Sequence, residues 1–265
     1  MRTNKAYLEK IGGEWLDDFV YISKERLKAL DFEIIPFDGD DMENTLMCYP
    51  LDISKDVIIG SVEATSVFFK ACGIEVPKYL GYPEELSAYF NREIERTVIG
   101  ELSKADFPCF IKPADGVKLF TGEVIKYIEQ VYNIKDYYDV TVDTPILKSG
   151  VIEFVSEYRC FVHEEELKGI QFYAGDYKVF PNPLVIEDMI DIYTTANCAY
   201  TLDVGVTANG GTWLVEVNDM WAIGSYGMDA RTYALMCVRR MREIGRQFHG
   251  ETENLWKKLK NRYNE

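Results

Sequence analysis

Two carboxylates and a carboxamide fall on one predicted β-hairpin of this chain. Asp203 lies in the first predicted strand, and Glu216 and Asn218 lie in the second, after a turn at 209–211. Residues two apart on a strand face the same side, so Glu216 and Asn218 project together. Pairing the strands about positions 209 and 210 brings Asp203 opposite Glu216. Such oxygen donors suit Mg²⁺, while the alternative interpretation is the polar outer face of an ordinary hairpin.

A second candidate set is a pair of lysines in the segment FIKPADGVKLFTG. Lys112 closes an apolar predicted strand, and Lys118 follows a short loop that contains Gly116. Lysines at such places bind phosphate oxygens as point charges. The segment has no GxxxxGK[ST] pattern, so it is not a Walker A loop. The alternative is that both ammonium groups extend into solvent.

A third candidate set lies in the segment VIEFVSEYRCFV. Glu153, Glu157 and Arg159 alternate with apolar positions, and Phe154 and Val155 form an apolar hinge between the two acidic residues. A planar heterocycle can stack on such a hinge, with a carboxylate binding ribose hydroxyls. The arginine can bind a phosphate or carboxylate through two hydrogen bonds. The alternative is an amphipathic strand whose charged side chains form surface ion pairs.

The charge balance narrows the classes of partner. The chain has 265 residues, of which 44 are acidic and 29 basic, giving a formal net charge of −15. This balance disfavours a general nucleic-acid binder and a protein that binds anionic membranes. It is compatible with an anionic small molecule held by a few local cations. Apolar residues make up 47% of the chain, which predicts a globular protein with a sizeable core.

Further sequence features indicate a cytoplasmic protein. The N-terminal segment has no apolar core typical of a signal peptide, and no stretch approaches the roughly 20 apolar residues of a membrane helix. The six cysteines are scattered, which predicts free thiols in a reducing compartment. With only two histidines, neither a histidine-based zinc site nor a Ser-His-Asp triad is expected.

The elements that must position these residues fall into two parts. Up to about Ala105, the patterns predict strands at 32–37 and 56–59, helices at 62–72 and 93–104, and an extended segment at 74–80, in a βαβ-type order. The second part predicts hairpin strands at 107–112, 120–125, 151–154, 158–163, 169–174, 199–206 and 212–217. A closing helix is predicted over 229–248. Together these elements predict an α+β fold.

The closing helix is predicted to be amphipathic. Its apolar positions would line one face, and its arginines would lie mostly elsewhere. The apolar positions are Ala234, Leu235, Val238, Met241 and Ile244, and the arginines are Arg239, Arg240, Arg242 and Arg246.

Together these motifs resemble the ATP-grasp superfamily over about residues 55–245. The runs KLFTG, SEYR and EVND, with the segment IIGSVEATSVFFKACGIEVPKYLGYP, look most like the branch called the Arg-to-Lys clade, known in phage and bacterial genomes. The resemblance implies an ATP-grasp fold, in which a small N-terminal α/β unit precedes two α+β subdomains that clasp the nucleotide. It implies an N-terminal domain over 1–105 and a nucleotide- and metal-binding region over 106–265.

The resemblance also implies roles for single residues. The implied ATP-binding residues are Lys112, Lys118, Glu153, Phe154, Val155, Glu157 and Lys178, and the implied Mg²⁺ ligands are Asp203, Glu216 and Asn218. Many family members carry an arginine two residues before the metal-binding aspartate, where this chain has Thr201. Arg159 or Lys178 is then the candidate cation that steadies the transferred phosphate. The implied catalytic residues are Lys112, Lys118 and Arg159.

The activity that the resemblance implies is that of an ATP-dependent carboxylate–amine ligase. It would act through an acylphosphate, on an amino acid or peptide. The acceptor pocket is expected near 219–228, with Trp221 and Tyr226 as candidates for specificity; the alternative is an aromatic core pair. Two rival functions stay open, namely an ATP-grasp-like nucleotide-binding module without ligase activity and an acidic protein that mimics DNA.

Overall fold

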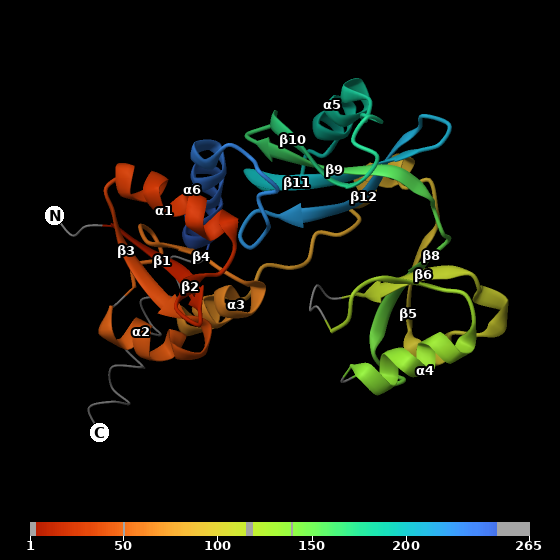
Figure 1. The fold of residues 1–265 in the computed structure, drawn as a ribbon, viewed down its shortest axis with the longest axis horizontal. Coiled ribbons are helices and arrows are strands. Elements are labelled where there is room, and N and C mark those ends of the chain that lie inside the picture. The colour runs from red at the N-terminus through yellow and green to blue at the C-terminus, as the bar shows by residue number, and fades with distance from the viewer. Residues whose placement is uncertain (1–3, 50, 115–118, 139, 248–265) are drawn as a thin grey trace.

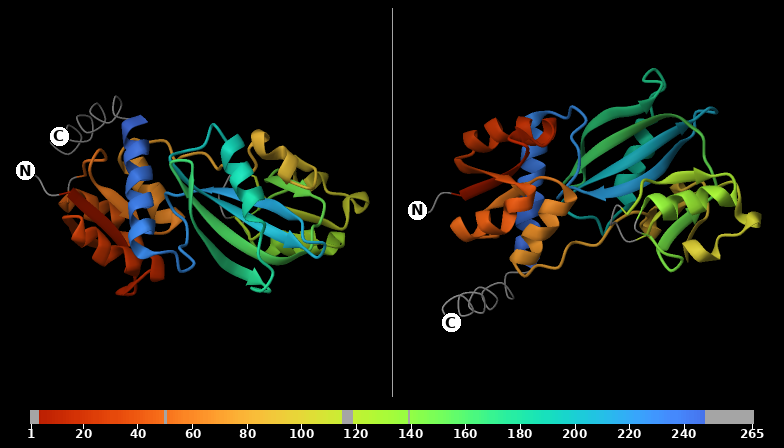
Figure 2. Two further views of the ribbon diagram at one scale, coloured as in Figure 1. Left: turned by 90° about the horizontal axis from the view of Figure 1, so that it is seen from above. Right: turned by 60° about the horizontal axis from the view of Figure 1, so that its bottom comes forward.

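Three sheets organise the part of the chain that the computed structural model describes, which is residues 4–49, 51–114, 119–138 and 140–247. Sheet A belongs to the N-terminal part, sheet C to the middle and sheet B to the later part of the chain. Sheet B lies between the unit built on sheet A and the unit built on sheet C (Figures 1 and 2). The predicted α+β class is confirmed.

Sheet A is mainly parallel, with β1 between β3 and β4 and with β2 antiparallel to β1. Its elements, with the helices beside it, are β1 (Asn4–Ile11), β2 (Glu14–Trp15), α1 (Asp18–Ala29), β3 (Phe32–Asp38), the 3-10 turn Gly39–Asp41, α2 (Met42–Cys48), β4 (Val57–Ile59) and α3 (Val62–Ala71). The strands predicted at 32–37 and 56–59 and the helix at 62–72 are confirmed. Ser61 begins α3, because its side chain accepts a hydrogen bond from the Ala64 N–H at 3.1 Å.

A linker over residues 73–83 leads from this N-terminal unit to the rest of the chain. The extended segment predicted at 74–80 lies within it, but pairs with no described strand of sheet A. The linker instead pairs with an edge strand of sheet B, where Gly81 forms an antiparallel bridge with Val217. Residues 74–80 are therefore not the third element of a βαβ unit. A 3-10 helix over Glu84–Tyr89 follows.

Sheet C is antiparallel, in the order β5-β8-β6-β7. It consists of β5 (Ile94–Val98), β6 (Cys109–Pro113), β7 (Glu123–Ile125) and β8 (Pro145–Ser149), with α4 (Ile128–Tyr137) and short 3-10 turns at Ile99–Glu101 and Lys104–Asp106. The helix predicted at 93–104 is wrong, because residues 94–98 pair with β8 along the whole strand. Since β5 falls in the range 1–105, sheet C takes strands from both predicted domains.

Sheet B is antiparallel, in the order β10-β9-β11-β12, and α5 (Pro183–Ile192) packs beside it (Figure 1). Its strands are β9 (Phe154–His163), β10 (Glu166–Gly175), β11 (Ala199–Thr207) and β12 (Thr212–Asp219). The strand predicted at 151–154 is wrong, since residues 150–153 carry the chain from sheet C to sheet B. Glu164 and Glu165 both have positive φ, of 51° and 62°, which fits a tight two-residue hairpin turn.

The closing helix α6 (Ala230–Gln247) joins the N-terminal unit to sheet B. Its buried residues include Ala234, Val238, Met241 and Ile244, as predicted, whereas Leu235 is exposed. They share one apolar core with sheet A, so α6 lies beside α1 and β4 (Figure 2). The N-terminal unit is therefore built from both ends of the described chain.

Arg240 is the exception among the arginines of this helix, because only 3% of it is exposed. Its Nε and Nη2 donate to the two carboxylate oxygens of Asp219 at 2.7 and 2.6 Å, and its Nη1 donates to Glu243 at 2.8 Å. A buried arginine needs such paired carboxylates to balance the cost of leaving water. The ion pair attaches α6 to the end of β12.

Two further expectations concern the cysteines and the membrane. All six cysteines are free, as predicted, and all are at least partly buried except Cys48, which is exposed. Among the described helices, none combines the length and the apolar character needed to cross a lipid bilayer.

Replacing Arg240 with alanine is expected to lower the free energy of unfolding by about 3–5 kcal/mol, since Asp219 would stay buried without its counter-ion. Arg239, the exposed neighbour, is the matched control, and Arg239→Ala should change this free energy by less than about 0.5 kcal/mol. Urea unfolding followed by circular dichroism measures both variants. Equal unfolding midpoints for the two would contradict a stabilising role for the ion pair.

Candidate functional site

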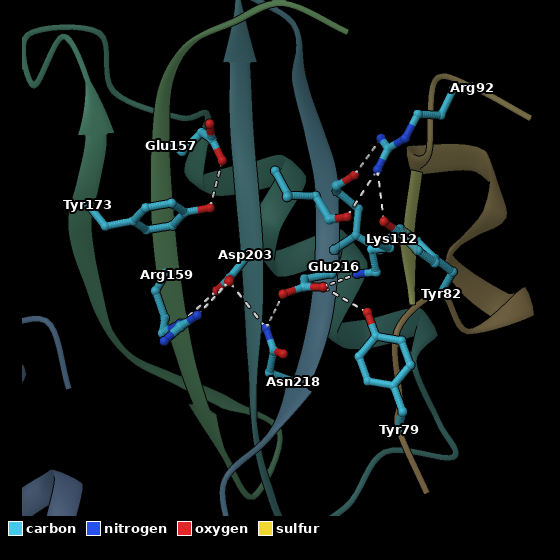
Figure 3. A network of polar contacts seen from close by, with 12 residues as sticks. Tyr79, Tyr82, Arg92, Lys112, Glu157, Arg159, Tyr173, Asp203, Glu216 and Asn218 are labelled. Atoms are coloured by element: carbon cyan, nitrogen blue, oxygen red, sulfur yellow. Dashed lines mark hydrogen bonds and ion pairs between the residues drawn. The ribbon is translucent and has the colours of Figure 1, made fainter. Parts of the chain in front are cut away.

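A polar network lies where sheets B and C approach each other (Figure 3). Asp203 on β11 pairs in register with Glu216 on β12, as the sequence predicts, and a bulge follows Asp203. Lys112 at the end of β6 reaches from sheet C to the carboxylate of Glu216. Three of the sequence-predicted residues therefore meet at one place, although they come from two sheets.

Asp203 forms a buried ion pair with Arg159. The two residues are register partners on β11 and β9, and they are 3% and 6% exposed. Arg159 donates from Nε and Nη2 to the two carboxylate oxygens at 2.8 and 2.7 Å, the bidentate geometry that is specific to arginine. Burial raises the pKa of Asp203 above its usual value, although the charge of Arg159 opposes this.

Glu216 is surrounded by hydrogen-bond donors. Its Oε2 accepts from Lys112 and from the hydroxyl of Tyr79, the latter at 2.7 Å. Burial acts to raise the pKa of Glu216, but the charge of Lys112 and these hydrogen bonds lower it below its usual value. The carboxylate is therefore ionised at neutral pH.

Asn218 connects the two carboxylates. Its Nδ2 donates to Asp203 at 3.2 Å and to Glu216 at 3.1 Å. All three predicted metal ligands thus lie within reach of one another. Among the described residues no group of three or more Asp, Glu, His or Cys side chains could hold a metal ion. The two carboxylates suit Mg²⁺ when phosphate or water supplies other oxygens. Asn218 would have to turn its Oδ1 toward the ion, because its Nδ2 faces both carboxylates here.

The hinge predicted from 153–157 lies at the start of β9. Glu157 projects beside Gly205 of β11, on the side of the strand that carries Arg159, and accepts a hydrogen bond from Tyr173 at 2.8 Å. Glu153 is exposed and precedes the strand, while Phe154 and Val155 are half-buried. The ring of Phe154 lies so close to Gly205 that a Cβ there would be 2.2 Å from it.

One predicted lysine, Lys178, is not part of this network. Lys178 is exposed, and its ammonium lies 5.9 Å from the ring of Tyr177. Lys118 lies outside the described residues. Of the two candidates for the cation that would steady the transferred phosphate, Arg159 forms an ion pair with Asp203 in the network, whereas the ammonium of Lys178 lies by Tyr177.

The two acceptor-pocket candidates have different surroundings. Trp221 packs against Phe69 of the N-terminal unit, with ring centroids 5.4 Å apart, so it is an aromatic core residue. Tyr226 is 48% exposed, stacks on Tyr173 at 5.2 Å, and lies 4.6 Å from the guanidinium of Arg159. Only Tyr226 borders the polar network.

Sequence reasoning missed several aromatic and basic residues at the site. Lys112 lies between the rings of Tyr79 and Tyr82, at 4.9 Å from each centroid. Arg92 donates to the carbonyls of Leu214 and Val215 on β12, at 3.1 and 3.0 Å. The one local sequence feature that could have indicated them is the pair of tyrosines on either side of Gly81 in the linker. Its role is visible only from the contacts of these tyrosines with residues distant in the sequence, such as Lys112.

Residues 89–236, more than half of the chain, match the family model described as ATP-grasp domain, R2K clade family 2. No curated protein sequence matches the chain. A solved D-alanine–D-alanine ligase from Bacillus anthracis is similar with a TM-score of 0.58 and 12% identity, over 93% of this chain and 99% of that one.

A solved D-cycloserine synthetase is similar with a TM-score of 0.56 and 13% identity, over 90% of this chain and 100% of that one. The ATP complex of the Bacillus anthracis ligase gives a TM-score of 0.55, at 12% identity over 93% of this chain and 99% of that one. At such low identities the likeness concerns the fold, and it confirms the ATP-grasp architecture expected from the sequence.

Replacing Arg159 with leucine is expected to lower the free energy of unfolding by about 3–5 kcal/mol, because Asp203 is left buried without its partner. Adding Asp203→Asn should recover at least half of the loss, since the unpaired charge is then gone. A double-mutant cycle by urea unfolding measures this coupling. If the double variant is no more stable than Arg159→Leu, the ion pair does not carry the effect.

Proposed function

The chain belongs to the ATP-grasp family described as R2K clade family 2, and from this premise we propose that it is an ATP-dependent carboxylate–amine ligase. The observation that carries the proposal is the meeting of Lys112 with Asp203, Glu216 and Asn218. A cation from one sheet and oxygen donors from the facing sheet suit a metal–triphosphate complex bound between them.

We propose that Asp203, Glu216 and Asn218 hold Mg²⁺. Bound there, the ion would neutralise charge on the phosphate oxygens. In the ligand-free arrangement, Lys112 and Arg159 balance the two carboxylates instead. Lys112 could then exchange the half-buried carboxylate of Glu216 for a phosphate oxygen, because a bound Mg²⁺ would supply the neutralising charge to Glu216.

The remaining nucleotide contacts belong to the same proposal. The hinge, with Phe154 and Val155, would hold adenine, and Glu157 would bind the ribose hydroxyls, with Glu153 beside it at the exposed start of the strand. Lys118 is proposed to bind phosphate together with Lys112. Lys178 stays a candidate phosphate-binding residue, and its exposed ammonium, which lies 5.9 Å from the ring of Tyr177, would have to leave that ring to reach a phosphate.

The proposed chemistry needs no protein nucleophile. A substrate carboxylate oxygen attacks the γ-phosphorus, the bond to ADP breaks, and an acylphosphate forms. An amine then attacks the acyl carbon, so that phosphate leaves and the amine loses a proton. Lys112 and Arg159 would stabilise the charge of the moving phosphoryl group by position alone.

The substrate is proposed to be an amino acid or a peptide. Support comes from the similar folds of a D-alanine–D-alanine ligase and a D-cycloserine synthetase, whose names describe amino-acid chemistry. Tyr226 would border the acceptor pocket, because it is exposed beside Arg159. Six free cysteines support a reducing, cytoplasmic compartment.

Asp203→Asn, Glu216→Gln and Lys112→Ala are each expected to reduce ATP turnover at least 100-fold, on the order expected when one charge-stabilising group is removed. Lys148→Ala is the matched control for Lys112: Lys148 pairs with Ile111 in register, so it faces the other side of sheet C, where it binds Asp106. ADP release measures turnover, and circular dichroism checks folding. Wild-type ADP release from all three site variants would show that the site is wrongly assigned.

A pairwise screen of amino acids and short peptides is expected to find combinations that release phosphate from ATP. A Mg²⁺-dependent rise in melting temperature with ATP, but no turnover with any pair, would favour a nucleotide-binding module without ligase activity. No nucleotide-dependent shift at all would favour the acidic interaction protein instead.

A further inference from the structure

We propose that Tyr79, in the linker between the N-terminal unit and sheet C, is a positioning residue of the metal site. It would hold the carboxylate of Glu216 in the orientation that binds the metal. This inference rests on the proposed function, because it assigns a role to a residue next to a proposed ligand. The two residues are 137 positions apart in the sequence.

The linker is anchored beside the site by backbone hydrogen bonds. The Gly81 N–H donates to the Val217 carbonyl at 3.0 Å, and the Val217 N–H donates back at 2.8 Å. Val217 lies between Glu216 and Asn218, so the linker is attached to the part of β12 that carries two proposed metal ligands. Tyr79 therefore has a fixed backbone from which to reach Glu216.

Gly81 also makes room for the ring of Tyr79. A Cβ at Gly81 would lie 2.4 Å from Cε1 of that ring, and the glycine has a positive φ of 54°. The ring can thus lie against its own backbone, with its hydroxyl 2.7 Å from Oε2 of Glu216 (Figure 3). The sequence Tyr-Leu-Gly is what permits this placement.

The hydrogen bond from Tyr79 is the one expected to persist when nucleotide is bound. Oε2 of Glu216 accepts from Lys112 and from Tyr79, and Oε1 accepts from Asn218. Under the proposed function, Lys112 turns to phosphate and Asn218 binds metal. Tyr79 then remains to orient the carboxylate, and partners that orient a metal ligand commonly change metal affinity by about 10- to 100-fold.

Tyr82 provides a matched control. Its ring lies on Lys112 at the same 4.9 Å as the ring of Tyr79, but its hydroxyl contacts Arg92 at 3.4 Å rather than a carboxylate. Replacing either tyrosine with phenylalanine removes one hydroxyl and keeps the ring beside Lys112. Only Tyr79→Phe removes a hydrogen bond to Glu216.

The experiment is a titration of Mn²⁺ into the full chain with a non-hydrolysable ATP analogue, with free Mn²⁺ followed by electron paramagnetic resonance. Tyr79→Phe is expected to weaken Mn²⁺ binding about tenfold. Tyr82→Phe should stay within about twofold of the wild type. Gly81→Ala, which displaces the ring, should weaken binding as Tyr79→Phe does, and melting curves establish that each variant is folded.

The outcomes separate the two proposals. Equal Mn²⁺ affinity of Tyr79→Phe and wild type would overturn the role of Tyr79 and leave the proposed function standing. The same loss in Tyr79→Phe and Tyr82→Phe would overturn it too, since the effect would then not pass through Glu216. Failure of the wild-type protein to bind Mn²⁺ with the nucleotide analogue would overturn the proposed function as well.

Discussion

The site depends on holding two carboxylates together in a place with little water. Asp203 and Glu216 are direct register partners, so their charges repel, and burial makes each more costly. Arg159 and Lys112 make the arrangement tolerable, each from a different strand. Arg159 stays in sheet B with Asp203, whereas Lys112 comes from sheet C. The ion pair between Lys112 and Glu216 therefore connects sheets B and C at the place where we propose that the nucleotide binds.

The hairpin and its ligands could be predicted because their geometry is local. The turn at 209–211 pairs Val206 with Thr212, and the bulge next to Asp203 then shifts the register by one residue, so that Asp203 lies opposite Glu216 as predicted. The bulge itself was not predicted. The strands of sheet B could be recognised because short turns separate them. Their burial does not alternate, since β11 is buried along almost its whole length and β9 along most of it. The turns can be recognised without knowledge of the rest of the chain.

The errors have a common cause in contacts between distant residues. Residues 94–98 contain few features that distinguish a strand from a helix. They form a strand because they pair with β8. The helical spacing does not indicate that Arg240 is buried, because its burial depends on the ion pair with Asp219. The sequence indicates no role for Tyr79 or Tyr82, whose rings both lie 4.9 Å from the ammonium of Lys112. Arg159, one of the two cations that the sequence offered in place of the arginine absent at Thr201, lies opposite Asp203 on the adjacent strand, and this pairing could not be derived from a linear motif.

The position of α6 has a consequence for the order in which the protein folds during synthesis. Sheet A is translated before sheets B and C, but its core is completed by Tyr233, Met236 and Met241, which are translated after both. Until then, one apolar face of the nascent N-terminal unit has no cover and is exposed to other chains. The sheet-B and sheet-C body lies between these two halves in the sequence and can form before the unit closes. The unit at the start of the chain is thus the last to be completed.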